Sequence, residues 1–403
     1  MARLPGIEPS KGVICHVDMD CFYAACERLR EPELESEPLV VGMGYEPGET
    51  HGAVATASYE AREHGVESAM PISEALERLP RRTGDGASGE AGVYRPVDME
   101  FYESVSEDIR SVLESAAETV RNVSIDEAYL DLDGTAWEET QAFGESLKRT
   151  IETEAGVRAS VGIAPDMTTA KLASDAEKPD GLVVVEPGDV RSFLAPMVVE
   201  SLHGVGPVTA RALREMELET AGEIAEADES TLVDAFGERG RELYAQARGE
   251  DDRTVQPKGR PKSLSSESAF VDTTDDPSPK RRKVRTLAME VAERATARNA
   301  LYKTIGVKVV RPPFDVNTRA RSLSGPVDDP ELVETTALEL LDEFESDPVR
   351  KIGVRLSNLS FDEREQATIE EWDSEDRTGR EAFETWRSRD GKRRKQTDLS
   401  RFY

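Results

Sequence analysis

Two short stretches of the chain place carboxylates inside runs of residues that otherwise predict β-strands. In VSIDEAYLDL (123–132), Asp126 and Glu127 stand side by side, and in HVDMDCFYAACE (16–27), Asp18 and Asp20 interrupt the end of an apolar run. Burying an unpaired carboxylate is costly, but acids from both stretches would together form an all-oxygen cage for Mg²⁺ and substrate phosphates. Two such ions about 3.5–4 Å apart serve phosphoryl transfer. Solvated acids at strand ends are the competing interpretation.

Strand geometry restricts how these acids can meet. Alternation sends Asp18 and Asp20 to one side of their strand and Met19 to the other. The same alternation would point Asp126 and Glu127 to opposite faces. We therefore expect a turn or a bulge at that pair.

Two further segments carry groups that suit a polyphosphate. In SYEAR (58–62), Tyr59 and Arg62 lie one helical turn apart and offer a hydroxyl and a guanidinium. In AKLASD…KPDG (170–181), Lys171 lies near the start of a helix. Together with the acids, these segments supply the parts of a nucleoside-triphosphate site.

The net charge is strongly negative, since 81 Asp and Glu face 51 Lys and Arg among 403 residues, which gives −30. Such a charge disfavours nucleic acid as a partner. An acid-rich, lysine-poor composition also resembles that of halophilic archaea, because acidic surfaces stay solvated at molar salt, where charges are screened within about 3 Å. We favour this second interpretation, which makes the remaining positive charge informative.

Positive charge is concentrated in three islands: 253–262 (RTVQPKGRPK), 280–285 (KRRKVR) and 387–395 (RSRDGKRRK). One island alone would indicate a solvated linker or tail, but three in so acidic a chain indicate a polyanionic partner. The first two islands supply the candidate DNA contacts Lys258, Arg260, Lys262, Arg281, Arg282 and Lys283.

The elements that must position the acids alternate between strand and helix. Strands are predicted at 13–18, around Asp126 and at 158–164, with helices up to 30 and over 71–79, 98–120, 140–156 and 167–178, while 52–66 turns from strand into helix. The Gly-rich segment 81–92 predicts a flexible surface loop. This first part is an α/β domain of mixed order.

Short helices follow from about residue 189. LHGVGPVTARALREM (202–216) and a weaker copy at 232–249 have the helix-hairpin-helix pattern. Gly204 and Gly206 would let the backbone approach a DNA phosphate, at which the next helix points its N–H groups. An ordinary helical turn is the alternative for one copy, and a tandem pair weakens it.

The last part has the order βαββαβ, a ferredoxin-like split unit. Strands are predicted at 263–272, 304–310, 315–323 and 349–361, with helices over 281–301 and 330–344. Residues 362–395 predict a disordered tether. No run approaches about 18 apolar residues, and the first fifteen residues lack the apolar core of a signal peptide, so we expect a cytoplasmic protein. Cys15, Cys21 and Cys26 have no metal-site spacing and predict buried, reduced thiols.

Over about 13–361 the chain resembles the Y-family of translesion DNA polymerases (DinB, polymerase IV type), through VDMDCFYA, AVATASYEAR, SIDEAYLD and AKLASD…KPDG. The resemblance implies a multidomain α/β and α+β fold, shaped as a right-hand polymerase. Its domains would be the palm (1–30 and 96–182), small fingers (31–95), helix-hairpin-helix thumb (183–252), basic linker (253–262), βαββαβ little finger (263–362), tether (363–395) and clamp-binding motif (396–403). The 81–92 loop looks like an insertion.

The resemblance also implies roles for single residues. Asp18, Asp126 and Glu127 would bind two Mg²⁺ ions with the Met19 carbonyl as a further ligand, whereas Asp20 has no metal role and is expected to be structural. The nucleotide contacts implied are Tyr59, Arg62 and Lys171 on the triphosphate, Tyr23 as a steric gate under the deoxyribose, and Ala53 and Ala55 near the nascent base pair.

The function implied is template-directed, low-fidelity DNA synthesis for translesion synthesis and repair, without proofreading. A nucleotide cyclase would share the metal acids but has no use for tandem helix-hairpin-helix elements. A catalytically inactive DNA-binding scaffold, recruited by the clamp, is the second rival. The intact acids with Tyr59, Arg62 and Lys171 argue against it, and a primer-extension assay decides.

The tail QTDLSRFY resembles the interaction motif for the sliding clamp (PCNA), through Gln396, Leu399, Phe402 and Tyr403. Its spacing puts Leu399 and the aromatic pair on one face of a helical turn, where they would anchor in an apolar pocket. A frayed, sticky terminus is the alternative. The expected partners are primer–template DNA, dNTPs and the clamp, and we expect a monomer.

Overall fold

The computed structural model describes residues 12–82 and 91–361. The chain divides into two compact units, Met1–Lys258 and Gly259–Tyr403, and the division falls inside the basic island 253–262. None of the helices in the described ranges is long and apolar enough to cross a membrane. All three cysteines are buried and free, which confirms the prediction of structural thiols.

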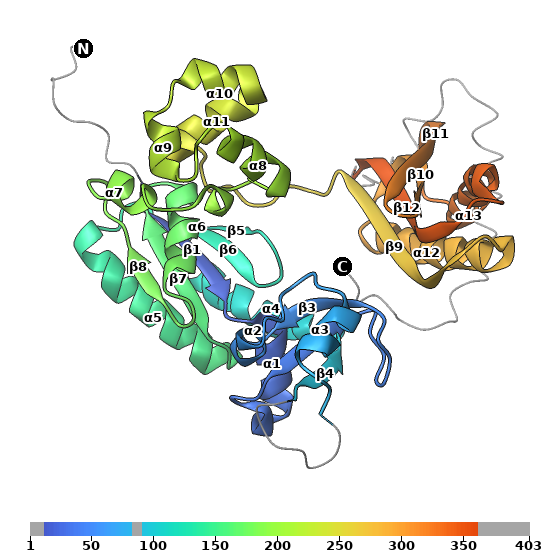
Figure 1. Cartoon of the computed structure of the whole chain (residues 1–403), viewed down its shortest axis with the longest axis horizontal. Coiled ribbons are helices and arrows are strands. Elements are labelled where there is room, and N and C mark those ends of the chain that lie inside the picture. The colour runs from blue at the N-terminus through green and yellow to red at the C-terminus, as the bar shows by residue number, and fades with distance from the viewer. Residues whose placement is uncertain (1–11, 83–90, 362–403) are drawn as a thin grey trace, which may run out of the picture. The chain divides into compact units, whose positions relative to one another are not determined.

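A five-stranded sheet forms the centre of the first unit, and β1 is its middle strand (Figure 1). The strand β1 is antiparallel to β6 and β7; β5 is antiparallel to β6, and β8 is parallel to β7. In the order in which they pair, the strands are β5 (Thr119–Asn122), β6 (Glu127–Asp131), β1 (Ile14–Met19), β7 (Ala159–Ala164) and β8 (Leu182–Val184).

The two faces of this sheet have separate cores. Cys15, Val17 and Met19 of β1 pack with buried residues of α1 (Phe22–Arg30), α4 (Met99–Ala116) and α5 (Trp137–Ala155). Ile14 packs instead with α6 (Met167–Ala176) and the helices that follow. Because strand side chains alternate between faces, His16 and Asp18 belong to the α6 side. The helix predicted over 98–120 ends at Ala116, since 119–122 form the strand β5.

A small three-stranded sheet with its own core completes this part of the chain, in the order β3-β2-β4. The pairing of β2 with β3 is antiparallel and that with β4 parallel. Its elements are β2 (Leu39–Met43), β3 (Ala53–Ala57), α2 (Tyr59–Glu63), α3 (Ile72–Arg78) and β4 (Val93–Pro96), after the short helix η1 (Pro32–Leu34). Most of the loop predicted at 81–92 falls outside the described residues.

A group of short helices shares its core with α6. Both predicted hairpins have a glycine with positive φ at the turn, Gly204 at 77° and Gly237 at 64°. Gly206 directly precedes α8, and Gly237 joins α10 to α11. The elements are α7 (Val190–Leu194), η2 (Val199–Ser201), α8 (Pro207–Glu215), α9 (Ala221–Glu226), α10 (Glu229–Phe236) and α11 (Glu238–Ala247).

The second unit has the predicted βαββαβ order, and its four strands pair as β11-β10-β12-β9. The first helix starts earlier than predicted, because the Asp276 side chain accepts from the Ser278 backbone N–H and Pro277 opens the first turn. Its predicted end at 301 is wrong, since Leu301 already belongs to a strand. The elements are β9 (Ser263–Thr274), α12 (Pro277–Ala297), β10 (Leu301–Arg311), β11 (Asp315–Val327), α13 (Pro330–Leu341), η3 (Asp342–Phe344) and β12 (Val349–Ser360).

Candidate active site

The pairing of β1 with β6 brings the first two acids together. Asp18 lies directly opposite Glu127 in this antiparallel register, and His16 lies opposite Tyr129. Directly opposed residues of antiparallel strands point to the same face. Asp18 and Glu127 therefore share the face that α6 covers.

The third acid, Asp126, reaches the same place from a turn. The strand β5 ends at Asn122 and β6 begins at Glu127, so the adjacent acids are divided between the turn and the strand, as strand alternation required. The Met19 backbone N–H donates to the Asp126 carbonyl at 2.9 Å, which ties this turn to the end of β1. Burial raises the pKa of Asp126 against the opposing hydrogen bond from Ser124, and the charges of Asp18 and Glu127 raise it further.

Two lysines neutralise these acids. Lys171 Nζ lies 2.9 Å from Asp18 Oδ2 and 3.2 Å from Glu127 Oε1. Lys178 Nζ lies 2.7 Å from Asp18 Oδ1 and 2.7 Å from Asp175 Oδ1. Lys178 is part of the quoted KPDG segment but was not singled out from the sequence, where only its basic type could have indicated it.

The arrangement was tested for its fit to a divalent cation. In the two described ranges, no three side chains of His, Cys, Asp or Glu are grouped closely enough to hold an ion as they stand. The Lys171 ammonium, however, bridges Asp18 and Glu127 as a bound metal ion would. Carboxylates from two facing strands and one turn form an all-oxygen donor set, which suits a hard ion such as Mg²⁺. The residues therefore fit a metal site.

Glu127 is held in its ionised form by its neighbours. Burial alone would raise its pKa, but the hydrogen bond from His16 and the charges around it, including that of Lys171, outweigh burial and lower the pKa to about 2. His16 was also not identified from the sequence. Nothing in its local sequence indicates a contact with an acid, and only the fold shows it.

Tyr23 of α1 lies close to the acids. It is half-buried, and its ring stacks on that of Tyr102 with centroids 4.7 Å apart and an interplanar angle of 18°. Burial, followed by the charge of Asp126, raises the pKa of the Tyr23 hydroxyl. The Tyr23 ring therefore lies near Asp126 and is held by its stacking on Tyr102.

Tyr59 and Arg62 form one group on α2. The Arg62 guanidinium lies 5.0 Å from the Tyr59 ring centroid and donates to the Ala57 carbonyl at 3.1 Å. The Tyr59 hydroxyl donates to Asp20 Oδ1 at 3.2 Å. Ala53 and Ala55, both partly exposed, precede this group on β3.

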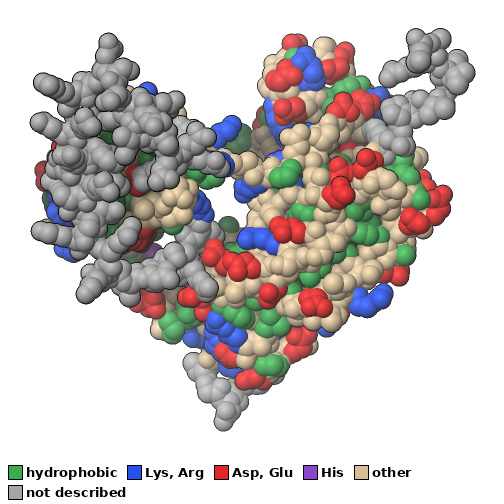
Figure 2. Space-filling view, turned by 180° about the vertical axis from the view of Figure 1, so that it is seen from behind, with side chains coloured by type: hydrophobic (Ala, Val, Ile, Leu, Met, Phe, Trp, Pro, Cys, Tyr) green, Lys and Arg blue, Asp and Glu red, His purple; other side chains and the backbone are tan. Residues whose placement is uncertain are grey.

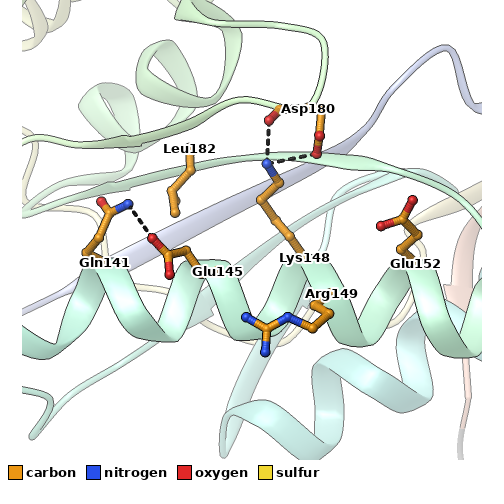
Figure 3. Close-up of a pocket in the computed structure, with 7 residues that line it drawn as sticks. All are labelled: Gln141, Glu145, Lys148, Arg149, Glu152, Asp180 and Leu182. Atoms are coloured by element: carbon orange, nitrogen blue, oxygen red, sulfur yellow. Dashed lines mark hydrogen bonds and ion pairs between the residues drawn. The ribbon is translucent and has the colours of Figure 1, made fainter.

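Asp20 has the contacts of a structural residue, as expected. Its carboxylate accepts from the Ser160 hydroxyl at 2.8 Å and from the Asp180 backbone N–H at 2.7 Å. It thereby joins β1, β7 and the KPDG segment. The helix α5 also contacts this segment, since Lys148 Nζ lies 2.8 Å from Asp180 Oδ1 (Figure 3). Both residues line a surface pocket. No acid of the candidate metal site lines this pocket.

The predicted DNA contacts differ in how available they are. Lys258 donates to the Val123 carbonyl at 3.3 Å, next to the turn that holds Asp126. Near the start of α8, the Arg239 side chain donates to the His203 carbonyl beside Gly204. Gly206, at the N-cap of α8, has open space where a side chain would lie. In the second unit, Arg260 donates to the Phe361 carbonyl at 2.5 Å, while Lys262 is exposed.

The island 280–285 is less of a free positive surface than its sequence suggests. Lys280 is buried and donates to backbone carbonyls of Phe344, Glu345 and Asp347. Arg281 pairs with Asp342, and Lys283 donates to Ser268 and Ala269, whereas Arg282 is exposed. The predicted clamp residues Gln396, Leu399, Phe402 and Tyr403 lie outside the described residues.

Two family models match the chain. That of the impB/mucB/samB family matches residues 17–175, and that of the C-terminal domain of the same family matches residues 261–369. The first match includes all three acids with Tyr23, Tyr59, Arg62 and Lys171. The second includes the four-stranded unit.

Individual proteins are similar over nearly the whole length. The chain is 61% identical over 369 residues to DNA polymerase IV of Halobacterium salinarum (strain R1), covering 91% of this chain and 90% of that protein. Among solved structures, a Y-family DNA polymerase chimera of Dbh and Dpo4 matches with a TM-score of 0.76 and 28% identity, covering 86% of this chain and 99% of the other. An insertion ternary complex of Dbh DNA polymerase matches with a TM-score of 0.61 and 27% identity, with the same coverage.

Proposed function

The chain belongs to the impB/mucB/samB family and is a Y-family DNA polymerase of the DinB type, and we propose that Asp18, Asp126 and Glu127 form its catalytic centre. It is a DNA-directed DNA polymerase for translesion synthesis, which binds primer–template DNA and dNTPs and depends on divalent metal. The observation that carries the proposed centre is the register that opposes Asp18 to Glu127 while a turn presents Asp126.

Asp18, Asp126 and Glu127, with the Met19 carbonyl, would hold two Mg²⁺ ions. When bound, the ions neutralise the phosphates and activate the primer 3′-hydroxyl for attack on the dNTP. Lys171 and Lys178, which contact Asp18 in this structure, would turn from it to the phosphates when the ions are bound. We infer an enzyme without proofreading, because the described residues 12–82 and 91–361 hold no further group of three acids that would serve a nuclease.

The triphosphate would be held by Tyr59, Arg62 and Lys171, as expected, and by Lys178. Both lysines contact Asp18 within 3 Å, so each lies where a phosphate bound to the metal site would be neutralised. The Arg62 Nε donates to the Ala57 carbonyl, so the two terminal Nη groups of the guanidinium would contact the phosphates. Tyr23 would lie under the deoxyribose as a steric gate, and the small Ala53 and Ala55 would leave room for a distorted base pair.

DNA would be bound by backbone and charge rather than by base edges. We propose that the hairpins at Gly204 and Gly237 hold phosphates in the thumb and that Lys258, Arg260 and Lys262 bind the backbone from the linker. Arg282 is the member of the second island that is best placed to contribute, since it is exposed. Arg281 and Lys283 would first have to leave their partners, Asp342 and Ser268.

A primer-extension assay on undamaged and lesion-containing templates tests the function. The full chain should insert the nucleotide that the template base specifies, and it should continue past a lesion such as an abasic site. An inactive DNA-binding scaffold, the alternative, would bind the same primer–template without extending it. Binding without any incorporation at molar KCl with Mg²⁺ would therefore refute the proposed centre.

We further propose that this cytoplasmic, monomeric enzyme is recruited by the sliding clamp through 396–403. A tether of roughly thirty residues would keep the catalytic core near DNA by raising its effective concentration. Deleting 396–403 should leave clamp-free primer extension unchanged and remove stimulation by the clamp. A truncated enzyme that the clamp stimulates as strongly as the full chain would show that the motif has another role.

A further inference from the structure

His16 is a fully buried histidine in direct contact with a proposed metal ligand. It lies on β1, two residues before Asp18, and has no exposed surface. Its Nε2 lies 2.7 Å from Glu127 Oε1, and its Nδ1 lies 2.7 Å from the Ser174 hydroxyl oxygen. The edge of the ring also packs on Tyr129, with centroids 4.5 Å apart. Both ring nitrogens thus have defined partners on two different elements.

The single hydroxyl proton of Ser174 decides which ring nitrogen carries hydrogen. The hydroxyl can donate either to the Lys171 carbonyl, at 2.7 Å, or to His16 Nδ1. If it donated to Lys171, Nδ1 would need its own proton. A neutral ring would then turn the lone pair of Nε2 toward the Glu127 carboxylate, which is repulsive. A doubly protonated ring would place a second cation, with no exposed surface, against the same Glu127 oxygen that the Lys171 ammonium already contacts.

The remaining arrangement satisfies every group. Ser174 donates to Nδ1, which fixes the tautomer that has its hydrogen on Nε2, and Nε2–H donates to Glu127 Oε1. The Lys171 ammonium approaches the same oxygen at 3.2 Å. Both contacts are made to Oε1, so the second oxygen, Oε2, is the one that we assign to a metal.

We propose that His16, with its tautomer set by Ser174, is a positioning residue that holds the Glu127 carboxylate in the orientation needed for metal binding. The inference rests on the proposed role of Glu127 as a metal ligand. Outer partners of this kind orient a ligand and increase its basicity, and their loss commonly costs 10–100-fold in metal affinity or activity. A histidine that only fills the core would affect metal binding solely through packing, so the substitution that packs worst would have the largest effect.

Substitutions distinguish positioning from packing because the two predict opposite orders. His16→Phe keeps a ring in the core but removes the donor, whereas His16→Gln packs less well but keeps an N–H that can reach Glu127. Positioning predicts tighter metal binding by the Gln variant than by the Phe variant, and packing predicts the reverse. Ser174→Ala removes only the tautomer control. Cys15→Ala is its matched control, since it also removes one heavy atom from a fully buried site.

The experiment is a Mn²⁺ titration of the full chain, followed by the EPR signal of the free ion, together with the Mg²⁺ dependence of single-nucleotide incorporation. His16→Phe should weaken Mn²⁺ binding and raise the half-saturating Mg²⁺ concentration about 10–100-fold. Ser174→Ala should shift both in the same direction, and Cys15→Ala should shift neither. Metal affinities of Ser174→Ala and His16→Phe within about twofold of wild type would overturn the proposal.

Two further outcomes keep the result unambiguous. If His16→Phe does not fold, Ser174→Ala decides alone, because it removes a single buried oxygen. If the wild-type chain itself shows neither Mn²⁺ binding nor metal-dependent incorporation, the proposed function has failed. A wild type that binds and uses metal alongside unchanged variants means that only the role of His16 has failed.

Discussion

At the scale of single residues, the adjacent acids Asp126 and Glu127 are explained by the turn that separates them. The sequence predicted both the carboxylate set and the need for a turn, because strand alternation leaves no other way to unite neighbouring side chains. It did not predict the partners of those acids. His16 reaches Glu127 through the pairing of β1 with β6, and Ser174 and Lys178 come from α6 and the segment after it; these are long-range contacts that no local pattern encodes.

The steric gate gives a prediction at this scale. Tyr23→Ala should increase the use of ribonucleotides relative to deoxyribonucleotides by roughly 10–200-fold, as expected when a pocket loses steric discrimination against one small group. The ratio of kcat/KM for the two nucleotides measures it. Tyr23→Phe is the matched control, since the ring and its stacking on Tyr102 remain, and its ratio should equal that of wild type. An unchanged ratio in Tyr23→Ala would remove Tyr23 from this role.

At the scale of elements, long segments with clear periodicity were predicted well and short strands were not. The order βαββαβ and the helices around the acids are present. The strand β2 (LVVGM) was missed because it is covered on both faces and so shows no alternation. The strands β4, β5 and β8 have only 3 or 4 residues. They are stabilised by pairing with neighbouring strands rather than by the β-propensity of their own residues.

Lys280 belongs to a basic island that indicated a polyanionic partner, but its side chain has a structural role. Its buried ammonium donates to the backbone carbonyl of Phe344, the last residue of η3, and to those of Glu345 and Asp347 after it. Lys280→Met should therefore destabilise the second unit by about 1–3 kcal/mol, because those buried acceptors would lose their donor. Calorimetry of the full chain would report the lowered transition.

Arg282→Met is the control for this prediction. Arg282 belongs to the same basic island and is exposed, so its loss should change the free energy of unfolding by less than about 0.5 kcal/mol. Equal stability of the Lys280 and Arg282 variants would show that the carbonyls find other donors. DNA affinity, by contrast, should fall more in Arg282→Met than in Lys280→Met.

At the scale of the whole molecule, we propose that the excess of acid makes the stability of the chain depend on salt. Acidic side chains are spread over the visible face with Lys and Arg among them (Figure 2). Many of these are ion-paired, yet the net charge of −30 remains unbalanced. Self-repulsion of that charge opposes the compact state, and salt screens it. The predicted DNA contacts are too few to offset the repulsion between this acidic chain and DNA. The same salt screens that repulsion and so lets the chain approach DNA.

The melting temperature should therefore rise by several degrees between low and molar KCl. A triple variant of exposed acids on α4 (Glu107→Gln, Asp108→Asn, Glu114→Gln) tests the cause. It should melt higher than wild type at low salt and gain less from KCl, because part of the repulsion is gone. A wild-type melting temperature that stays constant or falls with KCl would contradict adaptation to high salt.

We propose that chemistry at this site depends on three carboxylates that are not needed to bind DNA. Single-nucleotide incorporation by Asp126→Ala, measured beside primer–template affinity at the same KCl and Mg²⁺ concentrations, tests it most directly. Asp108→Ala, which removes an exposed acid of α4, serves as control. We predict that Asp126→Ala binds DNA within about twofold of wild type while its incorporation rate falls by at least about 10²–10³-fold. Incorporation at the wild-type rate in Asp126→Ala would contradict the account.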